Sequence, residues 1–165
     1  MLKMTTDIDG TEAVSTVLLN LLNDFPALSH GKKIEFASLS DSGGISFFPT
    51  AGAILQSNTE SVTGKVKQVC LYPFNVIYRA ALKSESQRLH VKEFLDTLGK
   101  WLERQEITVD GTALHLSEYP PLASGNRKIT SIERVSPACL NAAYDDGVED
   151  WTVSIKLIYK NEFYK

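Results

Sequence analysis

The sequence has few of the residues that build reactive or cross-linked sites. Its 165 residues include two cysteines and three histidines. Cys70 and Cys139 lie far apart, no C-x-x-C pair occurs, and no histidine lies at metal-ligand spacing from either cysteine, which argues against a zinc or redox motif. The sequence allows a disulfide between the two cysteines but does not require one. The apolar residues around Cys70 predict a small buried side chain there.

Long hydrophobic runs and an excess of one charge are also missing. The net charge is −3, from 17 basic and 20 acidic residues, which is too balanced for a dedicated nucleic-acid binder. Residues 1–11 contain Asp7 and Asp9 and no continuous apolar stretch, so they do not resemble a signal peptide. No apolar stretch reaches the roughly 18 residues of a membrane span. We therefore expect no specific nucleic-acid or membrane partner and a reducing, cytoplasmic site of synthesis.

The length and the ordinary share of hydrophobic residues, 43%, predict one domain around one core. No internal repeat or linker divides the chain. We predict a single α+β domain over residues 1–165, with residues 1–9 as a flexible N-terminus.

The first helical pattern lies near the N-terminus. Apolar residues recur at helical spacing from Val14 to Phe25 and predict a helix over about residues 10–25. Thr11 is the expected N-cap, and Pro26 is expected to end the helix.

A second helix is predicted over about residues 84–104. Ser84 and Gln87 have the spacing of a capping box at its start. Gly99 costs roughly 1 kcal/mol relative to alanine inside a helix, so we expect it to mark a site of close packing.

Six segments have the composition or alternation of strands: residues 33–39, 45–48, 65–82, 129–135, 138–144 and 151–160. The segment 65–82 is the longest, and Pro73 within it lacks a ladder donor, which places this strand at an edge or at a bulge. The first two segments are separated by a turn and could form a hairpin. Residues 49–63 are expected to be a loop or an irregular edge of the sheet, and residues 110–128 are expected to be a loop.

These elements predict an α+β fold, in which two amphipathic helices pack on one mainly antiparallel or mixed sheet of about four to six strands.

The search for catalytic motifs is negative. Gly64-Lys65 lacks the earlier glycine and the following Ser or Thr of a phosphate-binding loop, and no dinucleotide-binding or nucleophile-elbow motif occurs. His30, His90 and His115 are isolated in the sequence and are interpreted as surface or partly hydrogen-bonded side chains. We therefore predict no catalytic, cofactor-binding, metal-binding or nucleic-acid-binding residue, and no cofactor.

Two charged clusters have alternative interpretations. The acidic cluster comprises Asp145, Asp146, Glu149 and Asp150. Its spacing fits no EF-hand, and a solvated β-turn is favoured over a divalent-ion site. The basic cluster around the long strand comprises Lys65, Lys67, Arg79 and Lys83. A solvated sheet edge is favoured over a nucleic-acid surface.

Three segments resemble a known family: residues 69–79 (VCLYPFNVIYR), 84–88 (SESQR) and 94–103 (FLDTLGKWLE). They are similar to the minor capsid or tail-terminator-like proteins of tailed bacteriophages and of prophages of Gram-positive bacteria. The resemblance covers roughly residues 12–105 and implies a non-enzymatic virion structural protein with a tail-terminator-like fold. Such proteins assemble in the host cytoplasm as rings, typically hexamers. They cap the tail tube and present a surface to the head connector, and their role needs no cofactor.

The resemblance thus implies three partners: further copies of the chain, the tail tube and the head-connector protein. We expect the strand 65–82 or its flanking loops to contribute to the contact between subunits, because a strand that outruns its neighbours offers unpaired backbone groups. The loops 49–63 and 110–128 are expected to contact the tube or the connector. A cytoplasmic protein-binding module and a small enzyme without a recognisable motif remain the alternatives.

Overall fold

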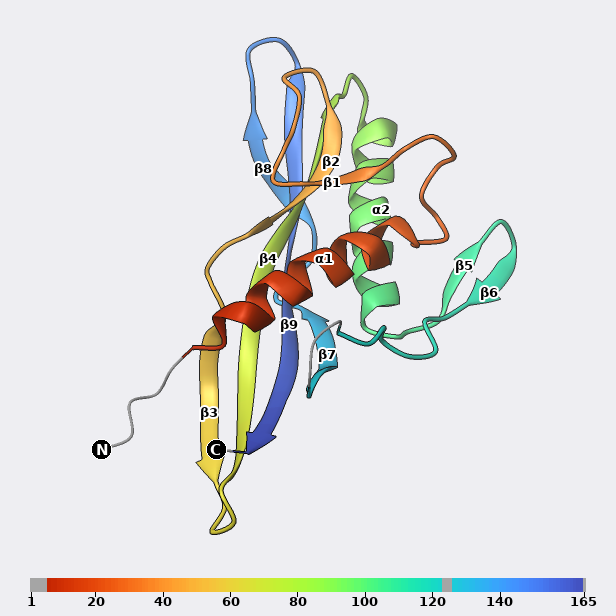
Figure 1. The fold of residues 1–165 in the computed structure, drawn as a ribbon. Coiled ribbons are helices and arrows are strands. Elements are labelled where there is room, and N and C mark those ends of the chain that lie inside the picture. Colours follow the sequence, from red (N-terminus) through yellow and green to blue (C-terminus); the bar gives the residue numbers. More distant parts are fainter. Residues whose placement is uncertain (1–5, 123–125, 165) are drawn as a thin grey trace.

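The computed structural model describes residues 6–122 and 126–164. In this part of the chain two helices accompany a mostly antiparallel, mixed sheet of seven strands and a separate two-stranded ribbon (Figure 1). The helices are α1 (Ile8–Asn23) and α2 (Glu85–Leu102); the strands are β1 (Ile34–Phe36), β2 (Gly44–Pro49), β3 (Ile54–Glu60), β4 (Lys65–Ala81), β5 (Ile107–Val109), β6 (Thr112–Leu114), β7 (Arg127–Arg134), β8 (Cys139–Ala143) and β9 (Val148–Tyr164). The predicted α+β class and the two helices are confirmed, and the sheet has more strands than expected.

Two long strands form the spine of the sheet. β4 and β9 each have 17 residues and pair antiparallel from Lys65 opposite Tyr164 to Ala81 opposite Val148. At about 3.3 Å per residue this ribbon is roughly 55 Å long. β2 and β3 pair successively with one side of β4, β7 and β8 pair with the other side of β9, and β1 adds to β2.

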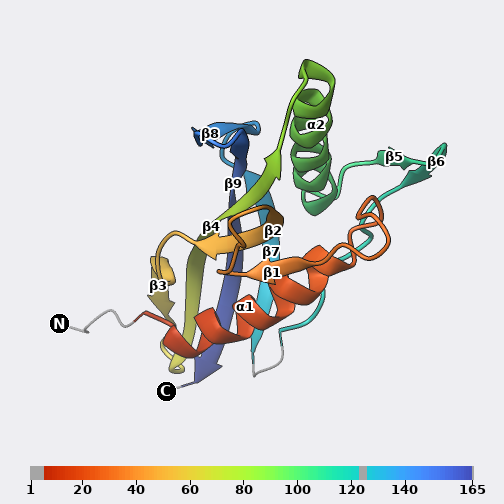
Figure 2. The same cartoon turned by 90° about the horizontal axis from the view of Figure 1, so that it is seen from above.

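Both helices cover the same face of this spine. Even-numbered residues of β4, from Cys70 to Tyr78, are buried on this face. The Tyr72 hydroxyl lies 2.7 Å from Ser15 Oγ of α1, whereas the Tyr78 ring packs edge-on against Phe94 of α2. α1 therefore covers the middle of the β4–β9 ribbon, and α2 covers the end of the ribbon at which β4 leads into α2 (Figures 1 and 2).

α1 begins earlier than predicted, and its N-cap is Asp7 instead of Thr11. The Asp7 carboxylate accepts a hydrogen bond from Gly10 N at 3.1 Å and is held by Arg127 of β7. This partner is distant in the sequence, so local capping rules could not identify it. Of the predicted flexible N-terminus, residues 1–5 lie outside the described residues, whereas Asp7 is part of the folded structure.

The start and the glycine of α2 agree with the predictions. Ser84 Oγ accepts a hydrogen bond from Gln87 N at 3.3 Å, and Gln87 Oε1 accepts one from Lys83 N at 2.7 Å. A methyl group at Gly99 would overlap the aliphatic Cγ and Cδ atoms of Arg134. Gly99 is therefore a site of close packing between α2 and β7.

The segment 49–63 contains an edge strand, the predicted loop 110–128 also contains a strand, and residues 33–39 and 45–48 do not form a hairpin. β3 lies in the segment 49–63 and pairs with β4, while β6 lies in the segment 110–128 and pairs with β5. β3 is an edge strand with both faces largely exposed, so it has no hydrophobic alternation to reveal it. β1 and β2 run parallel. The Ser46 hydroxyl binds both Glu35 O and Ser38 N, which holds the connecting chain against β2.

Pro73 lies in a central strand, in contrast to the predicted edge or bulge. Its carbonyl accepts a hydrogen bond from Thr50 N at 3.0 Å. The N and C=O of one strand residue point to the same side, so the missing donor faces the gap between the end of β2 at Pro49 and the start of β3 at Ile54. The strand thus loses no ladder bond at this position.

Side chains close two of the free sheet edges. On β1, Ile34 N donates to Asn23 Oδ1 at 2.8 Å, and Asn23 Nδ2 donates to Ile34 O at 2.9 Å. On β7, Ile132 N donates to the Tyr119 hydroxyl at 3.2 Å. Backbone groups satisfied in this way cannot pair with the strand of another chain.

Candidate interaction surface

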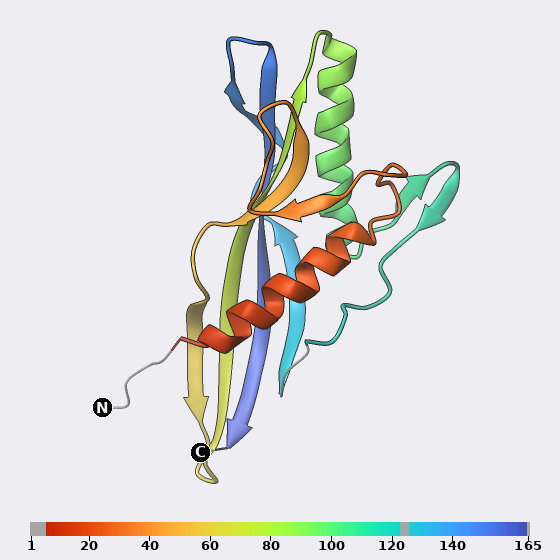
Figure 3. The same ribbon diagram turned by 45° about the horizontal axis from the view of Figure 1, so that its top comes forward.

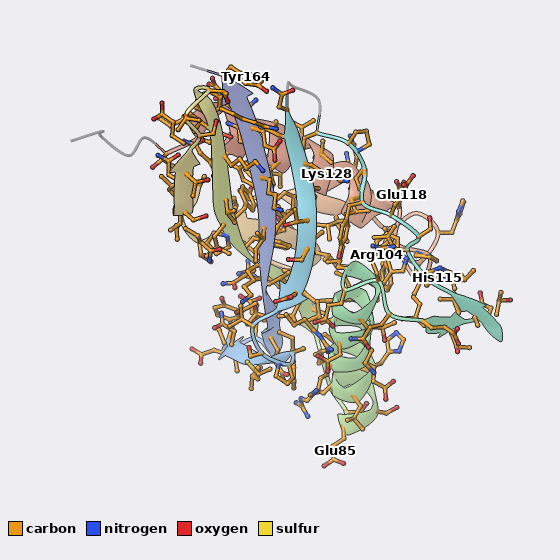
Figure 4. The ribbon with its side chains drawn as sticks, turned by 90° about the horizontal axis from the view of Figure 1, so that it is seen from below. Glu85, Arg104, His115, Glu118, Lys128 and Tyr164 are labelled. Atoms are coloured by element: carbon orange, nitrogen blue, oxygen red, sulfur yellow. The ribbon has the colours of Figure 1, made fainter. Side chains whose placement is uncertain are left out.

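The residues that could have indicated catalysis are not brought together. His30, His90 and His115 are exposed on three separate segments, and Figure 4 places His115 beside the β5–β6 hairpin. Among residues 6–122 and 126–164 no three His, Cys, Asp or Glu side chains converge to hold a metal ion. Cys70 and Cys139 are both free thiols, and Cys70 is buried as predicted, which raises the pKa of its thiol.

The acidic cluster is not the solvated turn that was favoured. Glu149 and Asp150 are only 7% and 3% exposed. The register of the spine places Asp150 opposite Arg79 of β4, and α2 brings Arg88 to Glu149. The interpretation as a solvated turn was therefore wrong for these two residues, because their partners come from distant elements.

Arg79 is the centre of a polar network at this end of the sheet. Its Nε lies 2.7 Å from Asp150 Oδ1 and its Nη2 lies 2.9 Å from Asp150 Oδ2. Nη1 donates to Ser40 O, and the Tyr144 hydroxyl donates to Asp150 Oδ2 at 2.8 Å. The bond from Arg79 holds the pKa of Asp150 below its usual range, and the bond to Asp150 raises the pKa of Tyr144. The interpretation of Arg79 as part of a solvated edge was wrong.

A second network joins α2 to β9. Arg88 Nε lies 3.1 and 3.0 Å from the two carboxylate oxygens of Glu149, and Trp151 Nε1 donates to Glu149 Oε1 at 3.0 Å. The hydrogen bond from Arg88, followed by the bond from Trp151, lowers the pKa of Glu149 below its usual range. Both networks pair their charges internally, so they fix the end of the sheet and leave no reactive group free.

Two cavities flank Arg79. The basic cavity, of about 340 Å³, is lined by Lys32, Lys33, Ser42, Gly43, Gly44, Ile45, Tyr78, Arg79 and Ala80. The acidic cavity, of about 640 Å³, is lined by Asp41, Arg79, Tyr144, Asp145, Asp146 and Val148. Side chains alternate along a strand, so Tyr78 and Ala80 face the helices while Arg79 faces the opposite side. Arg79 lines both cavities, so they adjoin at the same end of the sheet.

Each cavity retains charges that no described residue neutralises. Lys32 Nζ donates to the Tyr78 hydroxyl at 2.7 Å. Neither Lys32 nor Lys33 forms an ion pair within the described part of the chain, and the same holds for Asp41 and Asp145. The arrangement can bind charged groups of a partner in both cavities. The sequence predictions did not include Lys32, Lys33 or Asp41, because no local pattern joins them.

Comparisons with known proteins do not assign the chain to a family. No family model matches it, and no curated protein has a similar sequence. Neither described helix has the length and apolar character needed to cross a membrane.

Proposed function

We propose that this protein is a non-enzymatic structural component of a tailed bacteriophage virion. It acts as a tail terminator or as a head–tail joining (minor capsid) component, and it assembles as a ring that caps the tail tube. The resemblance of residues 69–79, 84–88 and 94–103 supports this role. In the structure these segments are the larger part of β4 and most of α2, and their buried residues belong to the same hydrophobic core.

The observation that carries the proposal is the elongated architecture around one spine. β4 and β9 pair over all their residues, and hairpins extend from the body at both ends and at one side (Figure 3). Such a shape presents several separate surfaces to neighbours. A ring subunit needs at least two for its neighbours and others for the tube and the connector.

The structure changes which part of the long strand can contact another subunit. β4 is paired with β2 and β3 on one side and with β9 on the other, so its backbone is not the free edge that the sequence suggested. The ends of the spine remain available. We assign the fully exposed Val62, in the β3–β4 turn, and the projecting β5–β6 ribbon to contacts with the tube or the connector.

Mass measurement at several protein concentrations and electron microscopy of the purified protein test the proposal. We expect six-fold rings with a central hole. A strict monomer at high concentration with a ligand in a pocket would contradict the ring and favour a small enzyme or a binding module. The neighbouring genes give an independent readout, because genes for a major tail protein and a tape-measure protein are expected beside this one.

A further inference from the structure

We infer that the two cavities beside Arg79 are the two halves of one contact between copies of this chain. In this contact the acidic residues Asp41, Asp145 and Asp146 of one copy face Lys32 and Lys33 of the next copy. The choice of a second copy as the occupant rests on the ring-forming function proposed above. The charges and the positions of the two cavities support it independently.

The basic half is a recess with an apolar floor. Ile45 and Ala80 line it, and the centroid of the Tyr78 ring lies 5.2 Å from Lys32 Nζ. The hydrogen bond between Lys32 and the Tyr78 hydroxyl positions one ammonium group at the wall. The Arg79 guanidinium is matched by Asp150, so the net positive charge of the recess comes from Lys32 and Lys33.

The acidic half lies on a projecting element. Asp145 and Asp146 form the turn between β8 and β9, at the top of the molecule in Figure 1, and both are exposed. Asp146 Oδ1 accepts a hydrogen bond from Val148 N at 3.1 Å, which orders the turn. Asp41 lines the same cavity from the loop before β2. This acidic turn is complementary in charge to the basic recess.

The positions of the two halves favour a head-to-tail contact. They are separate patches at the same end of the spine, and within one copy Lys32 and Lys33 form no ion pair with Asp41, Asp145 or Asp146. A contact between two different patches repeats from copy to copy and closes into a ring when its rotation allows. A nucleic acid is a poorer occupant, because Asp41, Asp145 and Asp146 add negative charge close to the recess.

Charge reversal on each half provides the test. K32E/K33E and D145K/D146K should each raise the protein concentration for half-assembly at least tenfold in analytical ultracentrifugation, because like charges then meet. A 1:1 mixture of the two variants should assemble again, since each reversed half now faces an opposite charge. The control K128E/K160E reverses two exposed lysines of β7 and β9 elsewhere on the molecule and should assemble like the wild type. Circular dichroism and thermal unfolding show that each variant is folded.

The possible outcomes separate this contact from the proposed function. Wild-type rings together with unchanged assembly of K32E/K33E, or failure of the mixture to assemble, would overturn the contact and leave the ring function standing. A wild type that stays monomeric at about 50 mM salt, where charges are least screened, would overturn the contact. Its gene neighbours would still test the virion role. DNA binding that is lost in K32E/K33E while assembly is unchanged would assign the lysines to phosphate groups instead.

Discussion

Replacement of Asp7 by asparagine should strongly destabilise the protein, although only one charge is removed. The Asp7 carboxylate both caps α1 and forms two hydrogen bonds of 2.7 Å with Arg127 of β7. The two side chains are only 5% and 14% exposed. Tyr159 donates a further bond to the Asp7 carbonyl oxygen at 3.2 Å, so the first turn of α1 is joined to both β7 and β9.

The expected loss of unfolding free energy for Asp7→Asn follows from this geometry. Removing one partner of a buried ion pair costs about 3–5 kcal/mol, because the other charge stays buried without compensation. Partial exposure of Arg127 reduces this cost, and asparagine can still cap the helix, so we expect about 2–4 kcal/mol. This is a large part of the roughly 5–15 kcal/mol that stabilises a typical domain.

The pH dependence of the same variant gives an independent check. Burial alone would raise the pKa of Asp7, but the hydrogen bonds from Arg127 and Gly10 outweigh it and hold the pKa below its usual range. A lowered folded-state pKa contributes stability that is present above the unfolded pKa of about 3.9 and is lost as the pH falls through the folded value. The difference in unfolding free energy between the wild type and Asp7→Asn should therefore be constant from about pH 5 to about pH 8 and should shrink below about pH 4.

Urea unfolding followed by tryptophan fluorescence measures these free energies. Asp9→Asn is the matched control, since Asp9 is an exposed acid in the same helical turn, and it should cost at most about 1 kcal/mol. A double-mutant cycle with Arg127→Met should show a coupling of about 2 kcal/mol or more. Equal losses for Asp7→Asn and Asp9→Asn, or no coupling to Arg127, would refute the anchoring role of Asp7.

Two further substitutions test packing and edge protection. Gly99→Ala should destabilise the protein by about 1–3 kcal/mol although alanine has the better helix propensity, because the new methyl group displaces Arg134. The control Lys100→Ala, at the neighbouring exposed position, should change stability by less than about 0.5 kcal/mol. A Gly99→Ala variant that is more stable than the wild type would contradict the close contact. Asn23→Ala should lower the unfolding free energy by about 1–3 kcal/mol and increase aggregation measured by light scattering, because it leaves the backbone groups at the edge of β1 unpaired. The control Asn20→Ala, on the exposed side of α1, should change neither property.

The elements that the sequence predicted correctly are those with a local signal. The alternating residues of β4 and of much of β9 reveal strands with one face in the core, and the capping residues Ser84 and Gln87 reveal the start of α2. The burial of one strand face and the capping of free N–H groups at a helix start involve residues only a few positions apart. Both therefore leave a regular pattern in the sequence.

The elements that it missed depend on distant partners. β3 is an exposed edge strand that exists because β4 offers a backbone ladder, and its polar residues carry no alternation. β1 is held by side chains that a strand pattern does not predict: Asn23 of α1 binds its free edge, and Ser46 of β2 binds Glu35 O. In these cases long-range hydrogen bonds decided between structures that local preferences left open.

The sequence by itself determined the α+β class, with two amphipathic helices and a mainly antiparallel sheet, and it identified β4 as a long strand but not its central place in the sheet. Only the tertiary structure decided which charges are paired and which remain open to a partner. Asp150 is neutralised because the register of the spine sets it opposite Arg79. Lys32, Lys33, Asp145 and Asp146, in contrast, form no ion pair within the described residues. Charge pairing depends on distances of a few ångströms between residues far apart in the chain, and only folding sets those distances.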